Sequence, residues 1–341
     1  MTPKVQSPCG QFAPTPPTQY WPLVIISDIH FGKKISSADM LFEFLQRTRC
    51  DTLILNGDII DGWHLTGRRQ HKFPEMQKRV MDLINARIAE GMKVIYIPGN
   101  HDEALRKRGI FGKNYFGIHF SDSLIYTDRR NRRFFILHGD QFDPQILKDK
   151  GRVLFRIGDY AYEKYERLTE LNSIPSKASR KLLKQKFSIS AYANEKAKNV
   201  LTVVGKFEKA VTQSAKKEGV DGIICGHVHL AEFEKKGNIH YGNSGDWVES
   251  CTALTCDEQG DWRVVRWLDE RERLGLSDYP DEHDSNPYQA YRSQTERQLR
   301  LMQRIWPANN RSEILENIRA LGRDVEHTNE KLRVSRHQLK L

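Results

Sequence analysis

The stretch KVIYIPGNHDE, residues 93–103, joins a short apolar run to a cluster of polar groups. The run before Pro98 has the length and composition of a buried strand. An amide, an imidazole and two carboxylates follow it directly, from Asn100 to Glu103. A glycine at this place is ordinary turn chemistry, but a turn does not require the other groups. The stretch therefore raises a question of function as well as of fold.

The residues before this stretch alternate between apolar runs and helical patterns. LVIIS, which starts at Leu23, and TLILN, which starts at Thr52, are each followed by a helical pattern, and we expect helices over Ala38 to Arg47 and Glu75 to Glu90. This β-α-β-α-β order predicts a largely parallel sheet with crossover helices. Because the runs are apolar throughout, we expect strands that are buried on both faces.

Further strand-like runs have the short connections that are typical of hairpins. They are SLIYT, RRFFILHG, DGIICGH, AEFEKKG, NIHYGNSG, CTALTC and WRVVRWL. Two packed mixed sheets fit this series better than a single Rossmann sheet does. We therefore predict an α/β fold whose main domain spans residues 21–270.

A region without strand-like runs interrupts the series, and we expect a helical insertion over about residues 145–217. Its middle part mixes Lys and Arg with Phe187 and Tyr192, a composition suited to a cap or to a solvated helical hairpin. In its last part, apolar residues recur at helical spacing, which predicts a helix that packs on a sheet. These residues are Val200, Val204, Phe207 and Val211.

Both ends of the chain read as appendages. Residues 1–20 contain five prolines and no apolar run of signal-peptide length, so we expect a disordered leader. Residues 271–341 read as a linker and a helical C-terminal extension. Its two apolar stripes predict helices that dock on the body or on a second subunit, or that attach to a membrane. The stripes are Leu299, Met302 and Ile305, then Ile314, Ile318, Leu321 and Val325.

Composition narrows the partners and the compartment. The formal net charge is +10, which suits nucleic acid, a phosphorylated metabolite or an anionic membrane surface. The five cysteines follow no disulfide or zinc spacing, which favours a reducing, cytoplasmic compartment. There is no run of about 18 apolar residues that could span a bilayer. Basic residues are dispersed and no stacking platform is visible, which disfavours nucleic acid.

Five motifs stand at or just past the predicted strand ends, where open α/β sheets bind ligands. Each motif alone is compatible with a turn or a helix cap. Together they supply seven carboxylate, imidazole and amide groups without any thiolate, too many for one tetrahedral ion but suitable for two divalent ions. The groups are Asp28, His30, Asp58, Asn100, His138, His227 and His229. Asp58 is the natural bridge, and we expect manganese, with iron, zinc or nickel as alternatives.

The ordered motifs D-x-H, GD-x-x-D, GNH[DE], HGD and GH-x-H resemble those of the calcineurin-like metallophosphoesterases. The resemblance implies a four-layer αββα sandwich and metal-dependent hydrolysis of phosphoester or phosphoanhydride bonds. It implies that Asp28, His30, Asp58 and His229 surround one ion. It likewise implies that Asp58, Asn100, His138 and His227 surround the other.

The same resemblance assigns catalytic roles. His101, after the asparagine, is expected to act on the transition state or the leaving group, with Asp102 available to orient it. Position along the chain, rather than the resemblance, gives the remaining roles. Asp61, Trp63 and Asp143 are expected to contact the substrate, with a place in the core as the alternative for Trp63. Asp140 and Asp143 are also expected to orient His138.

Within the superfamily, the pieces SDIHFG, NGDIIDGWH, IPGNHDE, LHGDQFD, CGHVHLAEF and YGNSGDWVESC look most like the UDP-2,3-diacylglucosamine hydrolases of lipid A biosynthesis. This resemblance implies release of UMP from a lipid-like sugar nucleotide by a peripheral enzyme on the inner membrane face, with the insertion as a lid. Those hydrolases carry arginine where this chain has His101. A phosphodiesterase or phosphatase for another anionic substrate, a nuclease, and a non-catalytic scaffold are the alternatives, and a homo-oligomer stays open.

Overall fold

A computed structural model of the chain describes residues 19–33, 35–62, 73–108, 111–142, 191–276 and 286–305. The predicted leader up to residue 18 lies outside this part of the chain, as do most of the insertion and the second C-terminal stripe. Trp63 and Asp143 also lie outside it. The expectations for these residues stay predictions.

The described strands form two mixed sheets. The larger sheet has the order β12-β11-β1-β2-β3-β5-β4 and the smaller has the order β6-β7-β8-β10-β9. The strands of the larger sheet are β1 (Gln19–Ile26), β2 (Thr48–Asn56), β3 (Lys93–Ile97), β4 (Lys113–Tyr115), β5 (Ile118–Phe120), β11 (Thr252–Cys256) and β12 (Trp262–Arg266). Those of the smaller sheet are β6 (Leu124–Thr127), β7 (Arg133–Ile136), β8 (Gly222–Cys225), β9 (Glu232–Lys236) and β10 (Ile239–Asn243).

Helices pack against the two sheets, except that α8 packs against α3. They are α1 (Ala38–Arg47), α3 (Glu75–Ala89), α6 (Ala191–Glu218), α7 (Trp267–Arg273) and α8 (Arg292–Ile305), with short 3₁₀ turns η1 (Glu103–Arg108), η2 (Asp140–Phe142) and η3 (Gln289–Tyr291). The predicted bounds of α1 are confirmed, and those of α3 differ by one residue at the end. Strands β4 and β5 were not predicted, because each has only three residues.

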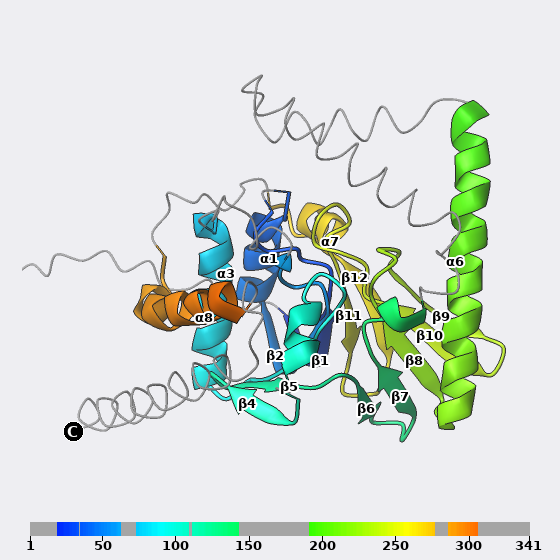
Figure 1. Ribbon diagram of the computed structural model, residues 1–341, viewed down its shortest axis with the longest axis horizontal. Helices are drawn as coiled ribbons and strands as arrows, with labels where there is room; N and C mark the ends of the chain where they lie inside the picture. The colour runs from blue at the N-terminus through cyan, green and yellow to red at the C-terminus, as the bar shows by residue number, and fades with distance from the viewer. Residues whose placement is uncertain are drawn as a thin grey trace, which may run out of the picture.

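The alternation of side chains along β1 shows why the fold has four layers. Val24 and Ile26 face the helices α1 and α3, whereas Leu23 and Ile25 face the smaller sheet. All four are fully buried. Since neighbouring strand residues point to opposite faces, a strand that is apolar at every position must be covered on both sides. Figure 1 shows the resulting order of helices, sheet, sheet and helix.

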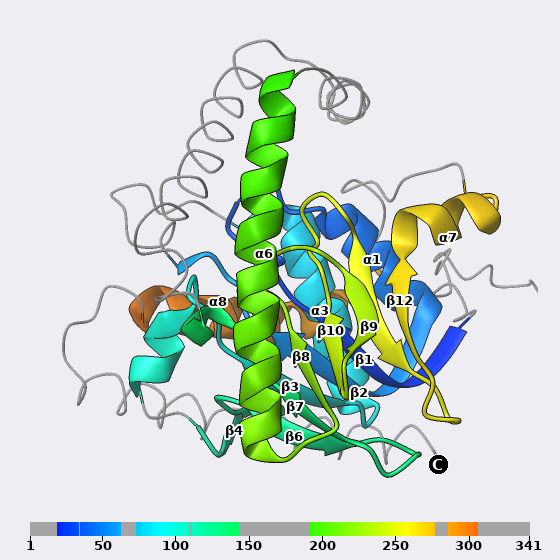
Figure 2. The same ribbon diagram turned by 90° about the vertical axis from the view of Figure 1, so that its right-hand side faces the viewer.

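Helix α6 covers the outer face of the smaller sheet (Figure 2). Phe207 and Val211 of the predicted stripe are buried there against Ile223 and Tyr241. The sequence-based prediction that this helix packs on a sheet is confirmed for these two residues. The side chain of Val200 lies outside the described part.

Parallel pairing gathers the ends of the central strands. β1, β2 and β3 run parallel in one sheet, and β7, β8 and β10 run parallel in the other. Their carboxyl ends therefore lie at one edge of each sheet, and these two edges adjoin. Every predicted motif follows one of these strands, so the topology alone places the motif loops together.

Helix α8 docks on α3 largely through buried polar contacts. The amide of Asn85 donates to Thr295 and Gln298 at 3.0 Å each, and its oxygen accepts from Gln298 at 3.0 Å. Arg292 lies 2.8 Å from the buried carboxylate of Asp82. Leu299 lies in the main core and Met302 packs against it, so these two residues of the first C-terminal stripe pack on the body of the same chain, one of the alternatives open from the sequence.

An apolar cavity of about 70 Å³ lies between α3, α8 and the loops after β1, β2 and β3. Its walls are almost entirely carbon, and they include Leu301 and Met302 of α8 and Phe31, Ile59, Ile60 and Leu105 of the loops. None of the described helices combines the length and the apolarity needed to cross a bilayer.

The packing of α8 at this cavity can be tested through the stability of a variant. Leu301 is buried at its wall. Leu301→Ala therefore removes packed side-chain atoms and enlarges a cavity whose apolar lining offers water almost no hydrogen bonds. We expect a loss of about 2–5 kcal/mol in the free energy of unfolding, measured with urea. Arg300→Ala, on the exposed face of the same helix, should change it by less than about 0.5 kcal/mol. Equal losses for the two variants would contradict this account of α8.

Candidate metal centre

The structure brings the candidate ligands together in two groups. Asp28, His30 and His229 form one group, and each offers a ligand atom within 4.8 Å of the others. Asp58, His138 and His227 form a second group by the same measure. Each group draws on both sheets, because His138 follows β7 and the two histidines of the GH-x-H motif follow β8.

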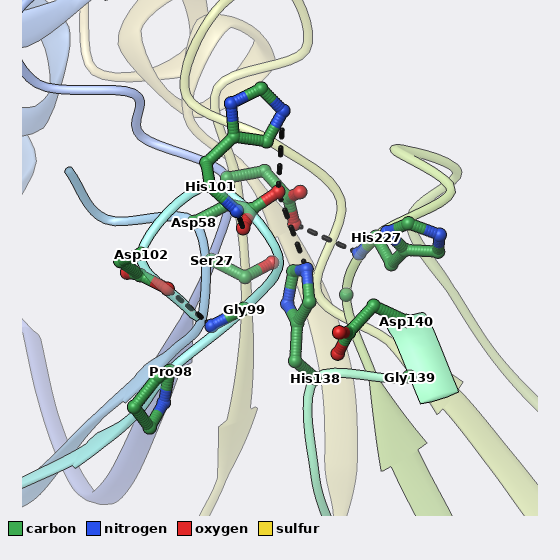
Figure 3. A network of polar contacts seen from close by, with 12 residues as sticks. Ser27, Asp58, Pro98, Gly99, His101, Asp102, His138, Gly139, Asp140 and His227 are labelled. Carbon is green, nitrogen blue, oxygen red and sulfur yellow. Dashed lines mark hydrogen bonds and ion pairs between the residues drawn. The ribbon is translucent and has the colours of Figure 1, made fainter. Parts of the chain in front are cut away.

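Asp58 lies at the centre of the arrangement (Figure 3). Its carboxylate accepts a 2.8 Å hydrogen bond from the backbone N–H of His101. The same carboxylate lies 3.4 Å from Nε2 of His138. Its backbone carbonyl accepts from the N–H groups of Ile29 and His30, at 3.0 Å each. Asp58 is 2% exposed, so one buried residue connects the loops after β1, β2, β3 and β7.

The first group is connected in the same way. Asp28 is fully buried, and one carboxylate oxygen accepts from the backbone N–H of His227 at 3.0 Å. The other oxygen lies 3.0 Å from Nε2 of His229. The His229 side chain is 37% exposed, whereas Asp28 is inaccessible. The group therefore reaches solvent on the side of the GH-x-H loop.

Five of the seven candidate ligands have a left-handed backbone. The φ angles are +53° at Asp28, His30 and Asp58, +68° at His227 and +57° at His229. This conformation is uncommon for residues other than glycine, although Asp, Asn and His tolerate it better than most. It costs of order 1–3 kcal/mol per residue, and such costs concentrate at functional sites.

Glycines make room for these side chains. A Cβ at Gly99 would lie 2.1 Å from Oδ1 of Asp58 and 2.6 Å from Nε2 of His138. A Cβ at Gly226 would lie 2.6 Å from Oδ2 of Asp28. The glycines of the GNHD and GH-x-H motifs are therefore required for close approach, beyond their role in turns.

Four candidate ligands have a buried polar atom without a hydrogen-bond partner among the described residues: Asp28, His30, Asn100 and His138. Nδ1 of His138 lies 2.8 Å from the carbonyl oxygen of Asn56, which favours a proton on that nitrogen and leaves Nε2 to accept. Nε2 is buried without a hydrogen-bond partner among the described residues, and Oδ1 of Asn100 is in the same condition. Unsatisfied buried polar atoms are rare, and a cation would satisfy both.

His101 is held by a carboxylate other than the expected one. Its Nδ1 lies 3.2 Å from Oδ2 of Asp61, and the ammonium of Lys33 lies 2.7 Å from the same oxygen. Asp61 is fully buried. The carboxylate faces His101 and Lys33, and its expected contact with substrate stays a prediction.

Asp102 connects two of the motif loops. Its carboxylate accepts from the hydroxyl of Tyr96 at 2.6 Å, from the N–H of Ile59 at 3.0 Å and from the N–H of Gly99. These contacts tie the loop after β2 to the loop after β3. The expectation that Asp102 orients His101 stays a prediction. Asp140 likewise pairs with Arg106, while the Asn56 carbonyl holds His138.

The carboxylates and imidazoles change one another's pKa values. Burial lowers the pKa of His138, but the Asp58 carboxylate outweighs it and raises the value to about 10. Burial likewise lowers the pKa of His229, but the Asp28 carboxylate outweighs it and raises the value to about 9. Burial and the charge of Asp58 raise the pKa of Asp102 to about 6. Without a cation, protons therefore occupy the two imidazoles at neutral pH.

Some supporting residues carry no signal in the sequence. Gln77 of α3 accepts from the N–H of Gly32 and donates to the carbonyl of Lys33, at 2.9 and 2.7 Å. It thereby holds the loop that supplies Lys33 to Asp61. Arg106 and Asn56 support other loops. Arg106 follows the GNHD motif by four residues and Asn56 directly precedes the GD-x-x-D motif, and only these places could have pointed to them.

A model of the calcineurin-like phosphoesterase family matches residues 22–231, which is more than half of the chain. No curated protein sequence matches the chain. A solved phosphoesterase structure from E. coli is 16% identical, with a TM-score of 0.32, and the match covers 72% of this chain and 98% of that one. A structure of a predicted phosphoesterase from Streptococcus pneumoniae is 14% identical, with a TM-score of 0.31, and the match covers 72% and 89%. Vps29 with zinc from Entamoeba histolytica is 13% identical, with a TM-score of 0.31, and the match covers 72% and 97%.

The glycine of the GNHD motif provides a test of the crowded geometry. Gly99→Ala places a methyl group against Asp58 and His138, so we expect phosphoester hydrolase activity to fall about 100-fold through displacement of the site. Gly205→Ala is the matched control, because a Cβ there meets nothing within 4 Å. It should keep its activity and gain up to about 1 kcal/mol in helix stability. Full activity in Gly99→Ala would contradict the geometry.

Proposed function

This chain belongs to the calcineurin-like phosphoesterase family, and from that premise we propose that it is a two-metal hydrolase of a nucleotide-linked, lipid-like pyrophosphate. The coarser statement, a metal-dependent phosphoester hydrolase, follows from the family. Beyond the family, we propose that two ions bind, which residues bind each of them, and which substrate is cleaved. One observation carries its chemistry: two groups of buried ligand atoms adjoin at Asp58, with Oδ1 of Asn100 and Nε2 of His138 unsatisfied among the described residues.

The donor set supports two divalent ions. We propose that Asp28, His30, Asp58 and His229 hold one ion, and that Asp58, Asn100, His138 and His227 hold the other. Carboxylate, imidazole and amide donors without sulfur suit manganese, iron, zinc or nickel, and manganese is our first candidate. When bound, such ions stabilise the charge of a phosphoryl transition state and make water more acidic.

His101 is proposed to assist the leaving group. Asp61 accepts at Nδ1 of His101, which leaves Nε2 directed toward the site, 3.9 Å from Oδ2 of Asp58. Burial lowers the pKa of His101, but the hydrogen bond to Asp61 outweighs it and raises the pKa above its ordinary value. A protonated Nε2 could donate its proton to the oxygen that departs when the P–O bond breaks. Asp61 acts through His101 and is a positioning residue.

The proposed substrate is UDP-2,3-diacylglucosamine or a related sugar nucleotide, cleaved to UMP and a lipid monophosphate in lipid A biosynthesis. The likeness of six sequence pieces to the hydrolases of that lipid supports it. The net charge of +10 supports it too, since an anionic membrane surface attracts basic proteins by about 1 kcal/mol per nearby Lys or Arg. The proposed place of action is the inner face of the cell membrane.

One observation favours a second candidate, a phosphodiesterase or phosphatase for another anionic substrate. His101 stands where the lipid hydrolases carry arginine, and its contact with Asp61 is built into the site. Arginine cannot give up a proton near neutral pH, whereas histidine can. A histidine here suits general acid chemistry on varied leaving groups.

A substrate panel separates these candidates. Manganese-loaded protein should release UMP from UDP-2,3-diacylglucosamine, and Asp58→Asn should lower the rate by at least about 1000-fold, because both ligand groups lose their shared carboxylate. Asp51→Asn, at an exposed aspartate paired with Tyr20, should keep the wild-type rate. Turnover of bis(p-nitrophenyl) phosphate without UMP release would reject the lipid substrate and favour the second candidate.

Proton release provides a separate test of the ligands. Metal binding requires neutral imidazoles, yet the pKa values of His138 and His229 are raised to about 10 and about 9 in the metal-free protein. Binding should therefore expel about two protons near pH 7. Apparent affinity should rise with pH until the pH passes these two values. Calorimetry of manganese binding in buffers of different ionisation enthalpy measures the release, and His119→Gln, at an exposed histidine, is the control.

A further inference from the structure

Arg106 lies in the 3₁₀ turn η1, six residues after Asn100, and its guanidinium contacts both sheets. One terminal nitrogen donates to Oδ1 of Asp140 at 2.7 Å, and the other donates to Oδ2 of the same carboxylate. Asp140 belongs to the loop after β7. The motif pattern assigned no role to Arg106 and a different role to Asp140.

The same guanidinium also fastens the loop on its own side. It donates to the carbonyl oxygen of Pro98, the first residue after β3, and its Nε lies 3.2 Å from Asp122. Pro98 precedes Asn100 by two residues, and Asp140 follows His138 by two residues. Arg106 therefore binds the chain close to two candidate ligands that come from different sheets.

The pair is sheltered enough to act as a defined link. The side chains of Arg106 and Asp140 are 23% and 12% exposed. A forked arginine–carboxylate contact is more directional and stronger than a single ion pair. The two sheets share no backbone ladder at this point, since β3 and β7 belong to different sheets. Side-chain links such as this one must therefore set the distance between their loops.

Asn100 depends on such a link more than the other ligands of its group do. His138 is fixed by the carbonyl of Asn56, and Asp58 by the N–H of His101. Oδ1 of Asn100 has no hydrogen-bond partner among the described residues. Its position thus follows from the course of the backbone between Pro98 and His101. The Arg106 contact with Pro98 restrains that course.

We infer that Arg106 and Asp140 are a positioning pair that holds Asn100 and His138 at metal-binding distance, and so sets the affinity of one of the two ions. The inference rests on the proposed metal site. The pair acts on the ion at Asp58, Asn100, His138 and His227. The contacts of Arg106 with Asp140, Pro98 and Asp122 do not involve Asp28, His30 or His229.

The contact with Arg106 also neutralises the negative charge of Asp140 beside the site. Asp140 lies beside His138 in Figure 3, near enough for its carboxylate to affect that imidazole. Both of its oxygens face Arg106. Without the guanidinium, this carboxylate would be free to compete with Asn100 for the cation. Loss of Arg106 therefore disturbs both the spacing and the ligand set.

Titration with Mn²⁺ alone tests the inference on the full chain. Wild type should bind two ions, and Arg106→Gln should bind one of them about 10–100-fold more weakly, as is typical when a residue behind a metal ligand is lost. Arg106→Lys keeps the positive charge but loses the two-pronged contact with Asp140, so its affinity for that ion should lie between those of wild type and Arg106→Gln. Calorimetry gives the two affinities, and electron paramagnetic resonance shows whether coupled manganese pairs become isolated ions.

Arg292→Gln is the matched control. Arg292 also pairs with a sheltered carboxylate, Asp82, but at the junction of α3 and α8. It should lower the thermal unfolding temperature without changing either manganese affinity. Double variants identify the ion: the effect of Arg106→Gln should largely disappear in an Asn100→Ala background and persist in a His229→Ala background.

The outcomes separate the inference from the function on which it rests. Selective weakening of one ion supports the positioning pair. Equal weakening of both ions, or unchanged affinities in Arg106→Gln, overturns it while leaving a two-metal hydrolase intact. A wild-type protein that binds no manganese, iron, zinc or nickel overturns the proposed function itself.

Discussion

Burial of the Asp58 carboxylate is the interaction on which the rest of the site depends. A buried charge is costly unless hydrogen bonds or opposite charges compensate it, and here the N–H of His101 and the imidazole of His138 do so. The backbone of the same residue accepts from Ile29 and His30. Four strand-end loops are thus built around one side chain. The left-handed backbone at five candidate ligands is strain that the packing of two sheets sustains, and the fold holds that strain where ligand atoms must converge.

Much of this arrangement could be predicted from the sequence because it depends on local pattern and parallel order. Apolar runs give the strands, and parallel strands bring their carboxyl ends to one edge, so Asp28, Asp58 and Asn100 had to lie near one another. His138 and His227 follow strands of the second sheet, and their approach needed only that the two sheets pack face to face. The αββα order supplied that condition.

The supporting contacts could not be predicted because they depend on the register between sheets and loops. Asp61 and Asp102 stand at similar distances from candidate ligands in the sequence, yet one faces His101 and the other faces Tyr96. A shift of one residue in such a loop changes the direction of a side chain and therefore its partner. The docking of α8 shows the same limit: its apolar stripe predicts burial, but buried polar residues of α3, Asn85 and Asp82, make the specific contacts with it.

The charges around the site follow a consistent pattern. Lys33 pairs with Asp61 and Arg106 pairs with Asp140, so two carboxylates that lie close to the candidate ligands are each opposed by a cation. Asn100 is neutral, which spares its group a further negative charge. The proposed ligands then contribute only Asp28 and Asp58 as anions, and two divalent ions outweigh them. A centre with net positive charge, reached from the side of the exposed His229, is suited to an anionic phosphoester, since the field at the opening attracts such a substrate.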